Sequence, residues 1–128
     1  MMQTNSQKMA QAAFTAVAGG AVSGEFKSFA RGFPTMAHTS GLAQAIAFAQ
    51  GKGMGGHHDR YLKILATVLN AGGFVPFPDT GKMAEMARAA GAEEYMRLSR
   101  GAFIAADWIK RYAEALAPDD IKKTEGRP

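Results

Sequence analysis

Glycine and proline residues divide this chain of 128 residues into short segments. Glycines cluster at 19–20, 51–56 and 72–73, and prolines stand at 34, 76, 78 and 118. Both residue types interrupt regular secondary structure, glycine through its backbone freedom and proline because it lacks a backbone N–H. The segments between them predict six helices with short links, over residues 5–18, 23–32, 40–50, 58–71, 80–90 and 92–117.

The composition of these segments favours helices over strands. Alanine, which loses no side-chain entropy in a helix, occurs 25 times, whereas valine and isoleucine together occur nine times. A β-sandwich or a parallel-sheet fold is therefore not expected. A chain of this length suits one hydrophobic core. We predict an all-α protein, a compact single-domain bundle of about six helices over residues 1–117, followed by a flexible C-terminal tail over residues 118–128.

Two of the predicted helices differ in how they should meet the core. The segment 40–50 has almost no charged side, so we expect its helix to run through the middle of the bundle, with Ser40 as its N-cap. The segment 58–71 shows the clearest amphipathic pattern. Its apolar stripe consists of Leu62, Leu65 and Leu69, flanked by Tyr61 and Val68.

The last predicted helix is the longest. Its start at Glu93 and Glu94 suits the positive end of a helix dipole, and Pro118 should stop it. Helical spacing predicts a core stripe along it, made of Tyr95, Leu98, Ala102, Ala105, Ile109, Tyr112 and Leu116.

The chain contains no cysteine, which excludes disulfide frameworks, cysteine-ligated zinc and thiol catalysis, and fits a cytoplasmic location. No run of about 18 apolar residues occurs, so we expect no membrane-spanning helix and no membrane partner. Residues 9–23 loosely resemble the apolar core of a signal peptide, but Gln11 and Thr15 interrupt it. An amphipathic first helix explains this segment better.

The glycine-rich stretch 51–56 (GKGMGG) matches the dinucleotide-binding fingerprint G-x-G-x-x-G as a string. That fingerprint works between a strand and a helix, where the glycine loop holds a pyrophosphate at the helix N-terminus. A predicted helix precedes the stretch here. We therefore expect a mobile interhelical loop and no nucleotide or other cofactor.

The histidines raise the question of a metal site. His57 and His58 are adjacent at a predicted helix start, so their side chains should point in divergent directions, and His38 is distant in sequence. Metal-binding helices use i, i+3 or i, i+4 spacing instead. Asp59 is more simply the N-cap or first-turn acid of the same helix. We expect neither a metal site nor a catalytic one, and the alternative is a metal-dependent enzyme built on these histidines.

The net charge of +4 belongs entirely to the first part of the sequence. Residues 1–73 hold six basic and two acidic residues, whereas residues 74–128 hold nine of each sign. This asymmetry suggests a basic surface built by the N-terminal helices, and the alternative is an ordinary solvated surface.

Helical spacing groups the basic side chains of this part. Lys27 and Arg31 share one predicted helix face, Arg60 and Lys63 share another, and Lys52 stands in the glycine-rich loop. Such a cluster suits contact with a phosphate backbone, which requires positive charge but no reading of base edges. The candidate nucleic-acid-binding residues are Lys27, Arg31, Lys52, Arg60 and Lys63.

Aromatic and basic residues also occur together near the end of the last predicted helix. Trp108 and Tyr112 with Arg111 have the composition of a surface that stacks on bases. Helical spacing favours a different arrangement, with Ile109 and Tyr112 in core and subunit contacts and Lys110 and Arg111 in water.

Two stretches of the sequence resemble a known family. Residues 33–48 (FPTMAHTSGLAQAIAF) are similar to the Pro-x-Met, Gly-Leu and Ala-Phe signature of the small helical subunit of type III-B CRISPR effector complexes, the fifth subunit of the Cmr complex. Residues 94–115 resemble that family's Tyr…Trp-Leu-Lys-Arg-Phe-Ala-Glu-Ala ending. The chain departs from the family at Ser40, where relatives often carry Asn, and at Ala37, where they carry a larger aliphatic residue.

The resemblance implies a non-catalytic role in antiviral defence. It implies that several copies of the chain stack, associate with the other Cmr subunits, and contact CRISPR RNA and target RNA through the backbone, while guide pairing supplies sequence specificity. The alternative from a different class is a helical protein–protein interaction module that binds no nucleic acid.

Overall fold

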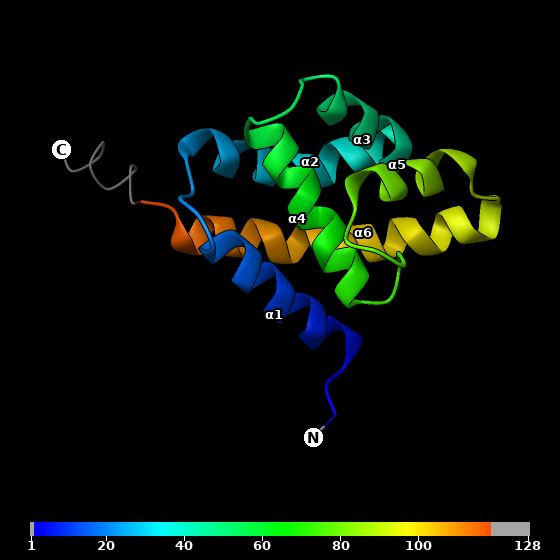
Figure 1. Cartoon of the computed structure of the whole chain (residues 1–128), viewed down its shortest axis with the longest axis horizontal. Coiled ribbons are helices and arrows are strands. Elements are labelled where there is room, and N and C mark those ends of the chain that lie inside the picture. Colours follow the sequence, from blue (N-terminus) through cyan, green and yellow to red (C-terminus); the bar gives the residue numbers. More distant parts are fainter. Residues whose placement is uncertain (1, 119–128) are drawn as a thin grey trace.

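The computed structural model describes residues 2–118, which form six α-helices and no strand within this range (Figure 1). The predicted all-α class is thereby confirmed. Apart from Pro118, the predicted tail lies outside the described residues. Across residues 2–118, no helix has both the length and the apolar composition needed to cross a membrane. The helices are α1 (Asn5–Ala18), α2 (Gly24–Ser40), α3 (Leu42–Gln50), α4 (His57–Ala71), α5 (Thr80–Ala89) and α6 (Ala92–Leu116).

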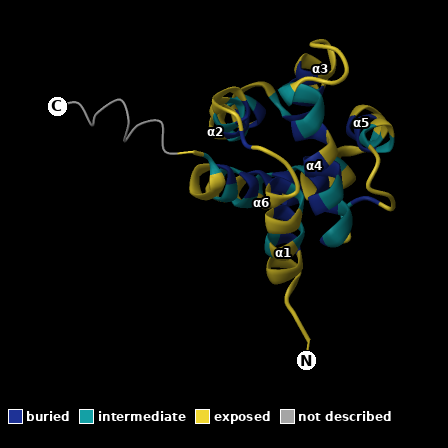
Figure 2. Cartoon of the chain, turned by 60° about the vertical axis from the view of Figure 1, so that its left-hand side comes forward, coloured by how far each residue is buried: buried dark blue, intermediate teal, exposed yellow. Residues whose placement is uncertain are grey.

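Helix α4 lies at the centre of the bundle and contacts each of the other five helices (Figure 2). The stripe predicted for it is confirmed, since Tyr61 and the leucines at 62, 65 and 69 are all buried together with Val68. Ile64 and Ala66 are buried as well, so α4 is covered over most of its circumference. A helix that is buried on several sides orders its neighbours around it.

Helix α6 runs along α1, α2 and α4, and small residues let these helices approach closely. A Cβ atom added at Gly101 would lie 2.5 Å from the ring of Phe74, so glycine at this position also lets the link between α4 and α5 pack against α6. The predicted stripe is partly confirmed: four of its residues are buried, whereas Tyr95 and Tyr112 are half-buried and Leu116 is exposed. The buried face is rotated toward small residues that the stripe omitted, namely Gly101, Ala106 and Ala113.

The predicted end of the second helix at residue 32 is wrong, because α2 continues through Pro34 to Ser40. A proline inside a helix removes one hydrogen bond and costs about 3 kcal/mol. Burial on both sides of the proline offsets this cost. The buried residues of α2 recur at helical spacing throughout, at Phe26, Ala30, Phe33 and Ala37.

The predicted N-cap Ser40 is also wrong, because this residue is the last one of α2. Gly41 links α2 to α3 with a φ of 90°, and a Cβ atom there would lie 3.2 Å from the Tyr95 hydroxyl oxygen. That hydroxyl accepts a hydrogen bond of 3.1 Å from the backbone N–H of Ala43. A tyrosine from α6 therefore supplies the capping group that the sequence suggested for a serine.

Helix α3 lies on the outside of the bundle, so the expectation that it runs through the middle is wrong (Figure 2). One side, with Leu42, Ala45, Ile46 and Ala49, is buried, and the other is exposed. Phe48 keeps 48% of its surface exposed. An alanine-rich helix looks apolar all round in sequence, but alanine is small enough to be tolerated in water as well as in a core.

Removal of the Tyr61 hydroxyl should stabilise the fold. Tyr61 is buried among Phe26, Phe29 and Phe33, and its hydroxyl has no hydrogen-bond partner among the described residues. Because a buried unpaired polar group costs roughly 1–3 kcal/mol, Tyr61→Phe should raise the free energy of unfolding by about 1 kcal/mol. Urea unfolding followed by circular dichroism measures the change.

The matched control is Tyr95→Phe, which removes the hydroxyl that accepts from Ala43. It should lower the free energy of unfolding by about 1 kcal/mol, because it leaves that N–H without its acceptor. Equal destabilisation by both variants would show that the Tyr61 hydroxyl is satisfied after all.

Candidate nucleic-acid interface

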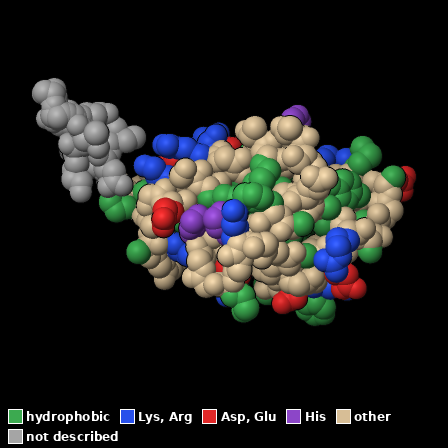
Figure 3. Space-filling view, turned by 90° about the horizontal axis from the view of Figure 1, so that it is seen from above, with side chains coloured by type: hydrophobic (Ala, Val, Ile, Leu, Met, Phe, Trp, Pro, Cys, Tyr) green, Lys and Arg blue, Asp and Glu red, His purple; other side chains and the backbone are tan. Residues whose placement is uncertain are grey.

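The five basic residues predicted to bind nucleic acid lie in different settings around α2. On one side of α2, Phe29 packs against His58 and Tyr61 at the start of α4. Arg31 comes two positions later, about 200° around the helix, and it faces α6. In Figure 3 the Lys and Arg side chains accordingly form separate groups, one of which lies beside histidine side chains.

Where α2 meets the end of α6, one carboxylate binds an arginine and is influenced by the charges of two lysines. The Nε atom of Arg31 donates to Oε2 of Glu114 over 2.9 Å. This hydrogen bond lowers the pKa of Glu114, and the positive charges of Arg31, Lys110 and Lys27 lower it further. Three cations and one carboxylate give a net charge of +2. We call Lys27, Arg31, Lys110 and Glu114 the α2–α6 basic cluster.

Lys110 was not among the predicted nucleic-acid-binding residues, and the sequence placed it only in water. Its position in the cluster depends on the packing of α6 against α2, which joins parts of the chain that are 83 residues apart at Arg31 and Glu114. The spacing of Lys110 and Glu114 is a visible i, i+4 pattern, but no sequence signal relates that pair to Lys27.

The remaining lysines lie near the start of α4. Lys63 forms an ion pair of 3.2 Å with Asp59 in the same helix, and Lys52 lies 4.9 Å above the Phe48 ring. Asp59 is the first-turn acid that the sequence suggested. Its pKa is lowered by the hydrogen bond from the Gly55 N–H and by Lys63. The charge of Lys63 is therefore partly neutralised by its neighbour.

Arg60 has both terminal nitrogens directed into the fold. Its Nη1 donates to the carbonyl of Ala21 over 2.6 Å, and its Nη2 donates to the carbonyl of Val17 over 3.0 Å. The guanidinium carbon also lies 4.7 Å from the Phe26 ring centroid. Arg60 thus caps the C-terminal end of α1 and holds the link to α2, where the last-turn carbonyls of a helix lack partners.

The histidines are arranged differently from the prediction. The side chains of His57 and His58 were expected to diverge, but their ring centroids lie 4.0 Å apart. The reason is Phe29, which packs against both rings and turns them to the same side. Burial lowers the pKa of His58, and the charges of His57 and Lys52 lower it further.

Within residues 2–118, no three histidine, aspartate or glutamate side chains are grouped closely enough to hold a metal ion. His38 lies apart from the other two histidines, with its ring 5.6 Å from that of Phe103 in α6. The glycine-rich loop follows α3, a helix, as predicted, so the strand that precedes a dinucleotide-binding loop is not found there. Its Met54 is 90% exposed.

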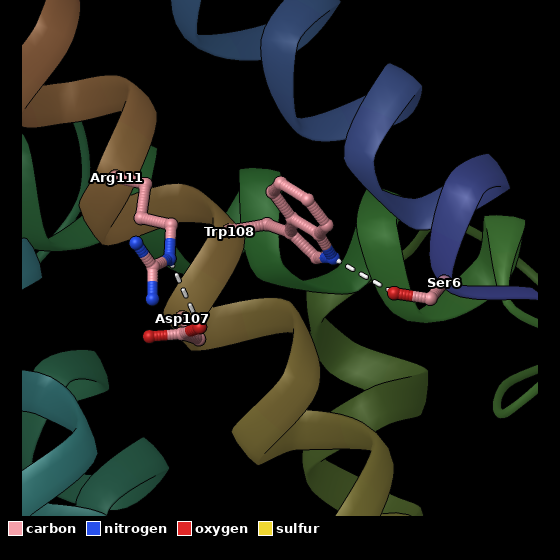
Figure 4. A network of polar contacts seen from close by, with 4 residues as sticks. All are labelled: Ser6, Asp107, Trp108 and Arg111. Atoms are coloured by element: carbon pink, nitrogen blue, oxygen red, sulfur yellow. Dashed lines mark hydrogen bonds and ion pairs between the residues drawn. The ribbon is translucent and has the colours of Figure 1, made fainter.

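The aromatic and basic segment near the end of α6 packs mainly against α1. The indole of Trp108 points toward α1 and donates to the Ser6 hydroxyl over 3.2 Å, while Arg111 pairs with Asp107 (Figure 4). Tyr112 stacks on Trp108 and meets Phe14 of α1 edge-on. The predicted burial of Ile109 is confirmed, and the aromatic rings hold two helices together.

Comparisons with known proteins give one consistent result. The model of the family described as "CRISPR-associated protein (Cas_Cmr5)" matches residues 5–116. A curated relative from Thermus thermophilus, the CRISPR system Cmr subunit Cmr5, is 37% identical over 118 residues, or 90% of this chain and 97% of the relative. The crystal structure of a CRISPR-associated Cmr5 family protein from Thermus thermophilus matches with a TM-score of 0.79 and 35% identity, covering 91% of this chain and 100% of that one.

Arg60 is expected to matter for stability. Arg60→Ala removes two hydrogen bonds to carbonyl oxygens and a cation–π contact, so it should lower the free energy of unfolding by about 1–3 kcal/mol. The control is Lys63→Ala in the same helix, where loss of an exposed ion pair should cost about 0.5 kcal/mol or less. Urea unfolding compares the two variants, and equal effects would contradict a capping role for Arg60.

Proposed function

Because the chain belongs to the Cas_Cmr5 family of CRISPR-associated proteins, we propose that it is a non-catalytic small subunit of a Cmr effector complex in antiviral defence. Its partners are the other Cmr subunits, further copies of itself, CRISPR RNA and target RNA. It steadies the paired RNA through the phosphate backbone, and guide pairing supplies sequence specificity.

The observation that carries the RNA contact is the α2–α6 basic cluster. It holds three cations for one carboxylate, of which Arg31 binds that carboxylate, and the side chains of Arg31 and Glu114 are 49% and 37% exposed. A partly exposed surface with excess positive charge attracts a polyanion and releases its counterions on binding. A phosphate backbone is the ligand that this chemistry fits.

The geometry of the cluster suits contacts with more than one phosphate. Lys27 and Arg31 stand one helical turn apart on α2, about 6 Å along the helix axis. Lys110, one helical turn before Glu114 on α6, adds a third cation, whose charge lowers the pKa of Glu114. Arginine can bind a phosphate with two nitrogens, and each lysine adds a mobile point charge.

The other predicted residues contribute less to the proposed surface. Lys52 lies in the exposed glycine-rich loop, and Lys63 on α4 has a side chain that is 65% exposed. Both are proposed as outlying phosphate contacts. Arg60 is left out of the proposed surface, because its two terminal nitrogens already bind backbone carbonyls.

Contacts with other protein subunits are supported by exposed apolar side chains. Phe48, Met96 and Ile104 keep 48%, 58% and 39% of their surfaces exposed, on α3 and α6. Phenylalanine and methionine are enriched at protein interfaces relative to the rest of the surface. We assign these surfaces to stacked copies and to other Cmr subunits, and the same surfaces would serve the alternative function, an interaction module without RNA.

The isolated chain should bind RNA weakly and with strong salt dependence. A labelled RNA duplex of about 20 base pairs serves as the probe in fluorescence anisotropy titrations. The three cations of the α2–α6 basic cluster should contribute about −2 to −3 to the slope of the logarithm of the association constant against the logarithm of KCl concentration, and phosphate contacts of Lys52 and Lys63 would make that slope steeper. Lys27→Gln/Lys110→Gln should weaken binding roughly ten-fold at low salt and reduce the slope by about 2.

The matched control is Lys8→Gln/Arg88→Gln, which removes the same charge from exposed residues of α1 and α5. It should change affinity much less, because it leaves the cluster intact. Binding that is independent of salt, or an equal loss in both double variants, would contradict the RNA surface. A failure to bind at any salt concentration would favour the interaction module.

Membership of a complex can be tested in the host. A tagged copy of the full chain, purified from its own cells under gentle conditions, should carry other Cmr subunits and CRISPR RNA with it. Mass spectrometry and RNA sequencing identify both. The Lys27→Gln/Lys110→Gln variant is informative here, because loss of RNA with retention of the protein partners separates the two kinds of contact. Recovery of the chain alone would contradict the proposed function.

A further inference from the structure

The ion pair in the α2–α6 basic cluster occupies only part of the Arg31 guanidinium. Its Nε atom binds Oε2 of Glu114, whereas Nη1 and Nη2 make no hydrogen bond to any residue in 2–118. A guanidinium can bind a phosphate with two parallel hydrogen bonds, either from Nε and one terminal nitrogen or from the two terminal nitrogens, and the second pair is not engaged by Glu114. Glu114 therefore holds Arg31 by one edge and leaves its other donors open.

We propose that Glu114 limits the affinity of the α2–α6 basic cluster for RNA phosphates. This inference rests on the proposed function of that surface. The Glu114 carboxylate places a negative charge beside the three cations and binds one of them directly. A phosphate that approaches Arg31 meets both the attraction of the cations and the repulsion of this carboxylate, so Glu114 keeps binding weak and reversible.

Within residues 2–118, the other carboxylates that pair with lysine or arginine lie in the same helix as their partner. Asp59 and Asp107 pair with Lys63 and Arg111 four positions later in their own helices. Glu114 on α6 instead accepts a hydrogen bond from Arg31 on α2, and the charges of Lys27 and Lys110 also lower its pKa. Its removal would raise the net charge of the cluster from +2 to +3, by the count of one carboxylate against three cations.

The decisive substitution is Glu114→Gln in the full chain. The amide oxygen of glutamine can still accept from the Arg31 Nε atom, so the side chain keeps its position while the negative charge is lost. With the labelled RNA duplex as the probe, affinity should rise about 3- to 10-fold at low salt, and the gain should shrink as salt screens the charges. Circular dichroism and urea unfolding verify that the fold is unchanged.

Two control variants separate charge at this position from other effects. Glu114→Asp keeps the charge and should bind RNA as the parent does. Glu93→Gln removes the same charge from the exposed start of α6, far along the helix from the cluster, and should change affinity less than about two-fold by the same screening argument. In the Arg31→Gln background, the gain in RNA affinity from Glu114→Gln should be smaller. Arg31, the cation for which the Glu114 carboxylate competes with the phosphate, is then absent.

The outcomes distinguish this inference from the proposed function. If Glu114→Gln leaves affinity unchanged or lowers it while Lys27→Gln/Lys110→Gln still weakens binding, the surface binds RNA but Glu114 does not limit it. An equal gain from Glu93→Gln would also overturn the inference, since it would show an effect of net charge alone. If none of these variants alters RNA binding, the proposed RNA surface itself fails.

Discussion

Five helices pack around α4, and the burial of this helix orders the rest of the structure. It packs against α1 and α6, and Tyr61 at its N-terminal end packs against the phenylalanines of α2. Because α4 is covered on several sides, each neighbour has a defined position relative to the others. The meeting of α2 with α6, which forms the basic cluster, follows from this arrangement.

The same packing decides which charged side chains bind other groups of the fold and which keep donors available to a ligand. Arg60 stands where α4 passes the end of α1, and its guanidinium satisfies carbonyls there. Arg31 stands on the opposite side of α2, where it retains open donors beside Glu114. Two arginines that look equivalent in the sequence therefore have different roles, because a cation that caps a helix end has few donors left for a ligand.

The proposed function agrees with this division of the charges. A subunit that steadies paired RNA needs a positive surface of moderate strength on a rigid support, and it needs no base-reading side chains. In this chain the support is a bundle of helices with small residues at their contacts, and the surface combines a long α6 with a proline-containing α2. Chemistry on the RNA is left to other subunits in this proposal.

The sequence by itself determined the all-α class, the number of helices and the core stripe of α4, because glycine and proline positions and helical periodicity are local properties. It also supported the family assignment. Only the tertiary structure decided that α2 passes through Pro34, that Tyr95 and not Ser40 caps α3, and that Lys110 joins Lys27 and Arg31. Each of these depends on contacts between residues far apart in the chain, and charge counted along a sequence does not reveal which side chains meet in space.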